Sequence, residues 1–148
     1  MIIRKMTPVD VPGVAAIEKL CFSQPWSEKS FLDSLERQDT VFLVCADETD
    51  TARAYVGMYV SFDEAEITNV AVDPQWRGLG YAQALIAEAK RCMKLQQIQR
   101  ILLEVRDSNV PAISLYKKYG FFEIGIRKGF YEFPTEDARI MVCELENE

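Results

Sequence analysis

Residues 70–89 constrain the fold most, because they predict a strand, a glycine-containing turn and a helix in direct succession. Apolar residues recur after the turn with helical spacing, at Ala82, Leu85, Ile86, Ala89 and Met93. The first amides of such a helix lack partners, and its dipole is positive there. No acidic residue lies between Gln75 and Ala87, and Arg77 adds positive charge. We therefore expect a pyrophosphate to bind at the start of this helix.

Length and charge narrow the class of protein. The chain has 148 residues, of which 49% are hydrophobic, so we expect one globular domain spanning 1–148. Its net charge of −6 disfavours nucleic acids and anionic membranes as partners and suits a cationic substrate better. The longest fully apolar run, 41–46, is far too short to span a bilayer. With no signal-peptide layout at the N-terminus, we expect a cytoplasmic protein, monomeric or weakly oligomeric.

The chain contains no histidine, which excludes Ser-His-Asp and Cys-His nucleophilic arrangements and histidine general bases. Proton transfer must then use Asp, Glu, Tyr, Lys, Cys, water or a terminus. The four cysteines form no CxxC pair, and their spacing predicts no metal site. We expect them to be reduced and mostly buried.

Local patterns predict the order β-α-α-β-β-β-α-β-α-β-β. The first helix is expected to begin with Thr7 as its cap, the second with Ser27, and the last with Ser108 or Asn109. Phe121 and Phe122 are expected in the core, and Phe130 to Thr135 in a loop. The fold class is therefore α/β (α+β), with a mixed, mostly antiparallel sheet of about seven strands and helices on both faces. Strands are predicted at 2–5, 40–46, 54–62, 66–72, 100–105, 121–127 and 138–145.

Two sequence blocks together carry a family resemblance. The first is Val70-Ala71-Val72-Asp73-Pro74 followed by Arg77-Gly78-Leu79-Gly80-Tyr81-Ala82, and the second, at 103–121, includes Glu104, Asn109, Tyr116 and Gly120. Over nearly its full length the chain resembles the GCN5-related N-acetyltransferases (GNAT). The resemblance implies a single GNAT domain that uses acetyl-CoA and needs no metal. A register starting at Gln75 also fits, but two residues usually separate Asp-Pro from the Arg.

Two further segments narrow the resemblance to bacterial N-terminal acetyltransferases of the RimI type. Pro25-Trp26-Ser27-Glu28-Lys29-x-Phe31 is similar to their first interhelical loop, and Phe130-Tyr131 with Glu136-Asp137-Ala138 to their last hairpin. This resemblance implies a protein acceptor, namely the N-terminal alanine of a ribosomal protein. Phe130 and Thr135 depart from the usual pattern and leave the peptide preference open.

The resemblance also assigns roles to individual residues. Glu104 is the base and Tyr116 the acid, and Pro25, Trp26 and Tyr131 line the slot for the acceptor. Acetyl-CoA is held by the strand end, the turn, the helix start and one later residue, namely Val70, Ala71, Val72, Arg77, Gly78, Leu79, Gly80, Tyr81, Ala82, Gln83 and Asn109.

Simpler readings of the same residues remain open. Glu104 stands at the end of a buried strand, where desolvation would raise its pKa, but it could instead pair with Arg106. Tyr116 could serve in packing alone, and Asn109 could be only a helix cap. Acetylation of a small amine or a lysine side chain is an alternative activity, and a non-catalytic acyl-CoA-binding regulatory module is another.

Overall fold

A computed structural model describes residues 1–145 and has the element order that the sequence predicts. The helices are α1 (Val11–Cys21), α2 (Glu28–Leu35), α3 (Tyr81–Leu95) and α4 (Val110–Lys118), with 3-10 turns η1 (Pro8–Asp10) and η2 (Pro74–Trp76). The strands are β1 (Ile2–Lys5), β2 (Thr40–Ala46), β3 (Ala52–Ser61), β4 (Glu64–Val72), β5 (Arg100–Arg106), β6 (Phe122–Tyr131) and β7 (Glu136–Glu144).

The seven strands form one mixed sheet in the order β1-β2-β3-β4-β5-β7-β6. Only β4 and β5 pair in parallel, and every other neighbouring pair is antiparallel. The parallel pair needs a crossover, which α3 provides along one face of the sheet. The predicted fold class is therefore confirmed.

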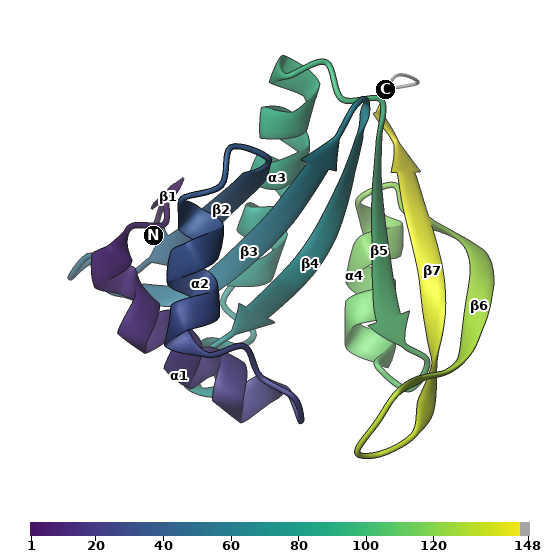
Figure 1. Ribbon diagram of the computed structural model, residues 1–148, viewed down its shortest axis with the longest axis horizontal. Coiled ribbons are helices and arrows are strands. Elements are labelled where there is room, and N and C mark those ends of the chain that lie inside the picture. Colours follow the sequence, from purple (N-terminus) through teal and green to yellow (C-terminus); the bar gives the residue numbers. More distant parts are fainter. Residues whose placement is uncertain (146–148) are drawn as a thin grey trace.

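Strands β4 and β5 pair along only part of their length. Their last paired residues are Ile67 and Leu103, although β4 continues to Val72 and β5 to Arg106. Figure 1 shows the two strands meeting beside the end of β7 and running apart toward their other ends. From residue 68 to 72, β4 keeps its partner β3 on one side but has no strand on the other.

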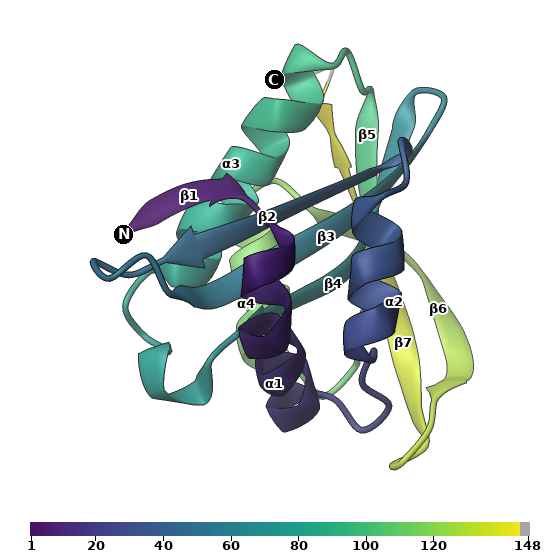
Figure 2. The same cartoon turned by 60° about the vertical axis from the view of Figure 1, so that its left-hand side comes forward.

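Helices cover both faces of the sheet (Figure 2). On one face, α3 and α4 pack through Leu85, Ile86 and Ile113 onto a core that includes Ile67 and Leu103. On the other face, α1 and α2 pack onto a second core. This second core contains Val11, Val14, Ile17, Phe31, Phe42, Val44, Tyr55 and Ala71. The two layers explain why both β2 and β3 are almost wholly apolar.

A β-bulge changes which way β4 faces. Gly57 pairs with Asn69 and Met58 with Ile67, so Thr68 is an extra residue on β4. Ile67 therefore lies in the core under α3, whereas Asn69 reaches Glu18 of α1 on the opposite face. The bulge thus turns a polar side chain of β4 toward α1.

The predicted capping residues stand at the starts of all three elements, although their hydrogen bonds differ. The Ser27 hydroxyl accepts a hydrogen bond from the Ser30 amide, and the Asn109 side chain accepts one from the Ala112 amide. At the first helix the Thr7 side chain donates instead of accepting. The Asp10 carboxylate accepts hydrogen bonds from both the Thr7 amide at 2.8 Å and the Thr7 hydroxyl at 3.2 Å. That start is a 3-10 turn rather than α-helix.

Three local predictions are wrong. The last two strands form a longer hairpin than expected, because the Tyr131–Glu136 pair leaves only residues 132–135 in the turn. Phe122 is 49% exposed, since β6 is an edge strand with no helix over it. Only Cys45 and Cys143 are buried, while Cys21 and Cys92 are half-buried.

No helix among residues 1–145 is long and apolar enough to cross a membrane.

Candidate active site

A cleft of about 470 Å³ lies where β4 and β5 separate. It brings together both catalytic candidates and four other predicted site residues. Pro25 does not line it, and neither do the residues of the turn before α3. The six predicted residues in the cleft are Glu104, Tyr116, Val70, Asn109, Trp26 and Tyr131.

Glu104 lies one residue beyond Leu103, the last residue of β5 that pairs with β4, so its side chain borders the gap between these two strands. Only 17% of the side chain is exposed, and burial raises the pKa of its carboxyl group above the usual value. Arg127 on β6, with Nε 3.5 Å from Oε1, opposes that shift, and Glu66 adds to it. The expected partner Arg106 instead pairs with Glu136 at 3.2 Å.

Tyr116 is 5% exposed and reaches the cleft from α4. Burial raises its pKa, and the nearby Tyr131 raises it further, so the phenol stays protonated near neutral pH. Burial also raises the pKa of Tyr131 to about 12, with Glu104 adding to the shift. Tyr131 therefore lies near both the candidate base and the candidate acid, and all three line the cleft. Tyr119, three residues further along the helix pattern, is half-buried and packs against the core under α3 and α4.

The residues predicted for cofactor binding form two neighbouring surfaces. Val70, Ala71 and Val72 lie on the stretch of β4 that has no strand partner on the β5 side, so its outward backbone groups can pair with an extended ligand. The Val72 carbonyl also accepts a hydrogen bond from the Cys21 thiol at 3.6 Å. Beyond η2, the turn enters α3 with positive φ angles at Gly78 (79°) and Gly80 (87°). Gly80 is the N-cap, so the first amides of α3 point out of the helix at this turn.

The side of the cleft that is predicted to bind the acceptor is made by the α1–α2 loop and the β6–β7 hairpin. Trp26 packs on Phe31, with ring centroids 5.3 Å apart. The Arg106 guanidinium lies over the Tyr131 ring at 4.5 Å and donates to the carbonyls of Glu132 and Pro134. The hairpin tip is therefore fixed to β5. Pro25 is exposed beside the cleft and not part of its lining.

Sequence patterns missed a buried polar cluster beside this cleft. Glu18 is 2% exposed in α1, and its carboxylate accepts hydrogen bonds from the Tyr55 hydroxyl, the Trp26 amide and the Asn69 side chain. One signal was available, because Glu18 interrupts the apolar face of a helix and Asn69 interrupts an apolar strand. Glu18 and Asn69 both line the cleft.

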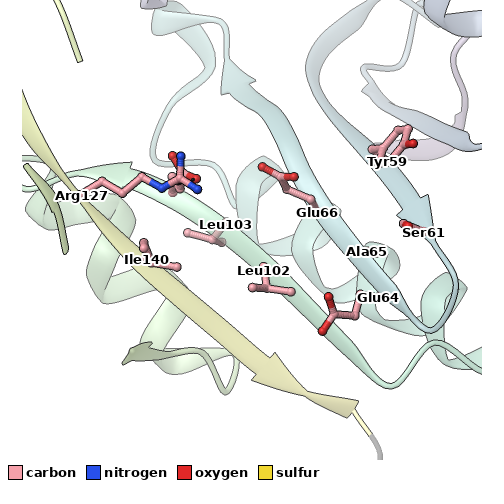
Figure 3. Close-up of a pocket in the computed structure, with 10 residues that line it drawn as sticks. Tyr59, Ser61, Glu64, Ala65, Glu66, Leu102, Leu103, Arg127 and Ile140 are labelled. Carbon is pink, nitrogen blue, oxygen red and sulfur yellow. Dashed lines mark ion pairs between the residues drawn. The ribbon is translucent and has the colours of Figure 1, made fainter. Parts of the chain in front are cut away.

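A second cavity, of about 240 Å³, shares Leu103 and Glu104 with the cleft. Figure 3 shows Glu64 and Glu66 projecting from β4 on one side of it and Arg127 on the other. Three of its lining residues are thus acidic and one is basic. No group of three or more His, Cys, Asp or Glu within residues 1–145 is arranged to hold a metal ion.

The splayed parallel pair, the glycine turn at a helix start and the acid–base candidates in the cleft define an N-acetyltransferase. The model of the acetyltransferase (GNAT) family matches residues 11–121, so the chain belongs to this family.

Comparison with individual proteins shows which members of the family this chain is similar to. The chain is 36% identical over 139 residues to a Bacillus subtilis protein, covering 94% of this chain and 92% of that protein. It is 33% identical over 137 residues to the [ribosomal protein bS18]-alanine N-acetyltransferase of Escherichia coli K12, covering 93% and 90%. The crystal structure of the E. coli ribosomal-protein-S18-alanine N-acetyltransferase superposes with a TM-score of 0.89 at 31% identity, covering 97% and 93%. The chain is therefore RimI-like.

Proposed function

We propose that this protein transfers an acetyl group from acetyl-CoA to the N-terminal α-amine of a protein, with alanine at the N-terminus of a bS18-type ribosomal protein as the acceptor. The observation that carries the proposal is the junction at Ile67 and Leu103. There the unpaired edge of β4, the buried Glu104 and Tyr116 meet in one cleft.

The cofactor surfaces fit acetyl-CoA by their chemistry. The pantetheine arm carries amide groups that can pair with the open edge of β4 at Val70 and Val72, as an added strand would. The pyrophosphate suits the α3 start, where free amides, the positive dipole end and Arg77 coincide. When bound, acetyl-CoA supplies the activated acetyl thioester. In this proposal the Val70 amide, on the β4 edge that β5 leaves unpaired, polarises the thioester carbonyl.

Glu104 and Tyr116 supply the two proton transfers. The α-amine of a protein has a pKa near ~7.7–8.0, so a carboxylate with a raised pKa is a competent base near neutral pH. The nitrogen then bonds to the acetyl carbon, and the carbon–sulfur bond breaks. Tyr116 keeps its proton because of burial and delivers it to the departing sulfur.

Two connected cavities support a polypeptide acceptor over a small amine. The cavities share Leu103 and Glu104, so an acceptor whose amine sits at Glu104 has room to continue along the sheet toward Glu66. The hairpin tip closes one side of the cleft through the Ser23 hydroxyl, which donates to the Glu132 carbonyl at 3.1 Å. A small amine would occupy only part of this space.

The test incubates the purified protein with acetyl-CoA and three versions of one peptide. The first begins with free alanine, the second has a blocked N-terminus, and the third has a blocked N-terminus and an added lysine. We expect mass spectrometry to find a single acetyl group on the first peptide only. Acetylation of the third would establish a lysine acetyltransferase, and no transfer to any peptide would contradict the proposal.

The double variant Glu104→Gln, Tyr116→Phe separates an enzyme from a binding module. We expect it to bind acetyl-CoA with unchanged affinity and to lose peptide acetylation. A parent protein that binds acetyl-CoA but transfers nothing to any amine would be the non-catalytic module.

A further inference from the structure

Only two buried side-chain oxygens among the described residues accept no hydrogen bond from the protein, and both border the same cleft. They are Oδ1 of Asn69 on β4 and Oε2 of Glu104 on β5. Each lies within two residues of the point where β4 and β5 cease to pair. Buried polar atoms are almost always hydrogen-bonded, so two unpaired acceptors at one junction point to a ligand that donates N–H or O–H groups there.

The orientation of Asn69 follows from its neighbour Glu18. A carboxylate without a proton can only accept, so the side-chain nitrogen of Asn69 faces Glu18, at 3.3 and 3.4 Å from its two oxygens. The remaining oxygen, Oδ1, must then point away from Glu18. Glu18 is itself fixed by the Tyr55 hydroxyl and by the Trp26 amide at 2.9 Å.

We infer that Asn69 is a second amine-binding residue. Its Oδ1 accepts a hydrogen bond from one N–H of the acceptor amine, while Oε2 of Glu104 accepts a hydrogen bond from the other. This inference rests on the proposed function, because it assumes that the amine reacts at Glu104. A neutral primary amine has two N–H groups. One proton passes to Glu104 as the nitrogen–carbon bond forms, and the other stays in the product amide, bound to Asn69. Glu18 acts through Asn69 as a positioning residue.

The inference predicts a chemical preference that packing alone does not produce. An N-methylated amine has only one N–H, and that one is lost to Glu104 during the reaction. The wild-type protein should therefore prefer an alanine peptide to its N-methylalanine counterpart in part through Asn69. Replacing Asn69 with a side chain that cannot accept a hydrogen bond should remove the share of this preference that Asn69 supplies.

The experiment compares kcat/KM for the two peptides in the wild type and in Asn69→Leu, which keeps the volume but has no oxygen. We expect Asn69→Leu to raise the KM for the alanine peptide about tenfold and to lower the preference for alanine over N-methylalanine by about the same factor. The KM for acetyl-CoA should not change. An unchanged preference, with both peptides losing activity equally, would show that Asn69 is only structural and overturn the inference.

Further variants guard against misfolding and test the orienting role of Glu18. Asn69→Ala is the smaller alternative if Asn69→Leu fails to fold; it also has no side-chain acceptor, and the same loss of preference is expected. Glu18→Gln presents a donor to Asn69, lets its amide turn, and should also lower the preference. Thr68→Val is the control. It removes the hydroxyl of the residue next to Asn69, which donates to the Gly57 carbonyl at 3.3 Å, and the preference for alanine over N-methylalanine should remain. If the wild type acetylates no peptide, the proposed function is wrong. If the wild type is active but the Asn69 variants keep the full preference for alanine over N-methylalanine, only this inference is wrong.

Discussion

Burial affects the proton chemistry of Glu104 and Tyr116 in the same direction. Both side chains are mostly buried beside the cleft, and both pKa values are raised for that reason. For a carboxyl group a raised pKa means a stronger base, whereas for a phenol it means that the proton is retained. In the proposed mechanism, a single physical cause thus makes the Glu104 carboxylate a stronger base and keeps on Tyr116 the proton that it donates.

Glu104→Gln should make the pH dependence of acetylation steeper. Glu104 is a carboxylate, and therefore a base, only above its raised pKa. Near neutral pH this carboxylate removes the proton that the amine loses by itself only at higher pH. We expect kcat/KM for an alanine peptide to fall about a hundredfold near pH 6.5 and far less near pH 9, where the amine is already neutral. Steady-state rates across this range are the measurement.

The matched control for that experiment is Glu66→Gln. Glu66 is an exposed carboxylate on the adjacent strand that lines the second cavity and not the cleft. Because Glu66 contributes to the raised pKa of Glu104, its replacement should move the pH profile slightly to lower pH without the large loss near pH 6.5. An equal loss at every pH in Glu104→Gln would contradict the assignment of Glu104 as the base.

Gly80→Glu should prevent acetyl-CoA binding. Gly80 has a φ of 87° at the start of α3, and the new carboxylate would stand where the pyrophosphate is expected. Gly80→Ala introduces the same backbone strain without charge, and the space beside Gly80 is open. In binding measurements we expect Gly80→Glu to have at least a tenfold weaker affinity than Gly80→Ala. Equal affinities would place the pyrophosphate elsewhere.

At the scale of elements, close contact between β3 and the neighbouring strand depends on one glycine. A Cβ atom added at Gly57 would lie 2.3 Å from Cε2 of Phe42, far inside contact distance. Gly57 also faces the bulge on β4 that turns Asn69 toward α1. The absence of a side chain there therefore allows the ring of Phe42 to fill the core under α1 and α2.

Gly57→Ala should destabilise the protein by about 1–3 kcal/mol, because the ring of Phe42 must move within a packed core. Gly125→Ala on β6 is the matched control, since its Cβ would meet only the Ile140 side chain at 3.8 Å. We expect a change below about 0.5 kcal/mol for the control. Denaturant unfolding of both variants is the measurement, and equal losses would contradict this account of Gly57.

Local sequence patterns predicted the elements well where the signal lies within the element. Ser27 is predictable as a cap, and Asn109 as one of two candidates with Ser108, because a cap acts on amides two or three residues away. The hairpin of β6 and β7 was predicted too short, because the pairing of Tyr131 with Glu136 depends on the opposite strand. Phe122 was placed in the core because its own sequence does not show that β6 lies at the edge.

At the scale of the whole molecule, charge and shape favour a cationic acceptor. The net charge is −6, and the cavity that continues from Glu104 is lined by Glu64 and Glu66. Arg127 partly offsets these carboxylates. A positively charged peptide should therefore be drawn toward the site more strongly than a neutral one.

Salt should weaken this attraction. From about 0.01 M to about 1 M ionic strength the screening length falls from about 30 Å to about 3 Å. We expect the KM of an acceptor peptide with arginines after its N-terminal alanine to rise roughly tenfold over this range. The control peptide has glutamine in place of each arginine, and its KM should change little. The same salt response for both peptides would contradict a role for the acidic cavity.

The sequence by itself determined the strand, turn and helix at residues 70–89, because hydrophobic spacing, two glycines and the lack of acidic residues act locally. It also limited the proton chemistry, since no histidine is present. Tertiary structure decided where β4 and β5 stop pairing and which side chains border the gap. Tyr55 and Asn69 lie 37 and 51 residues from Glu18, and only the packed sheet and α1 bring them together. Such contacts leave no periodic pattern in the chain.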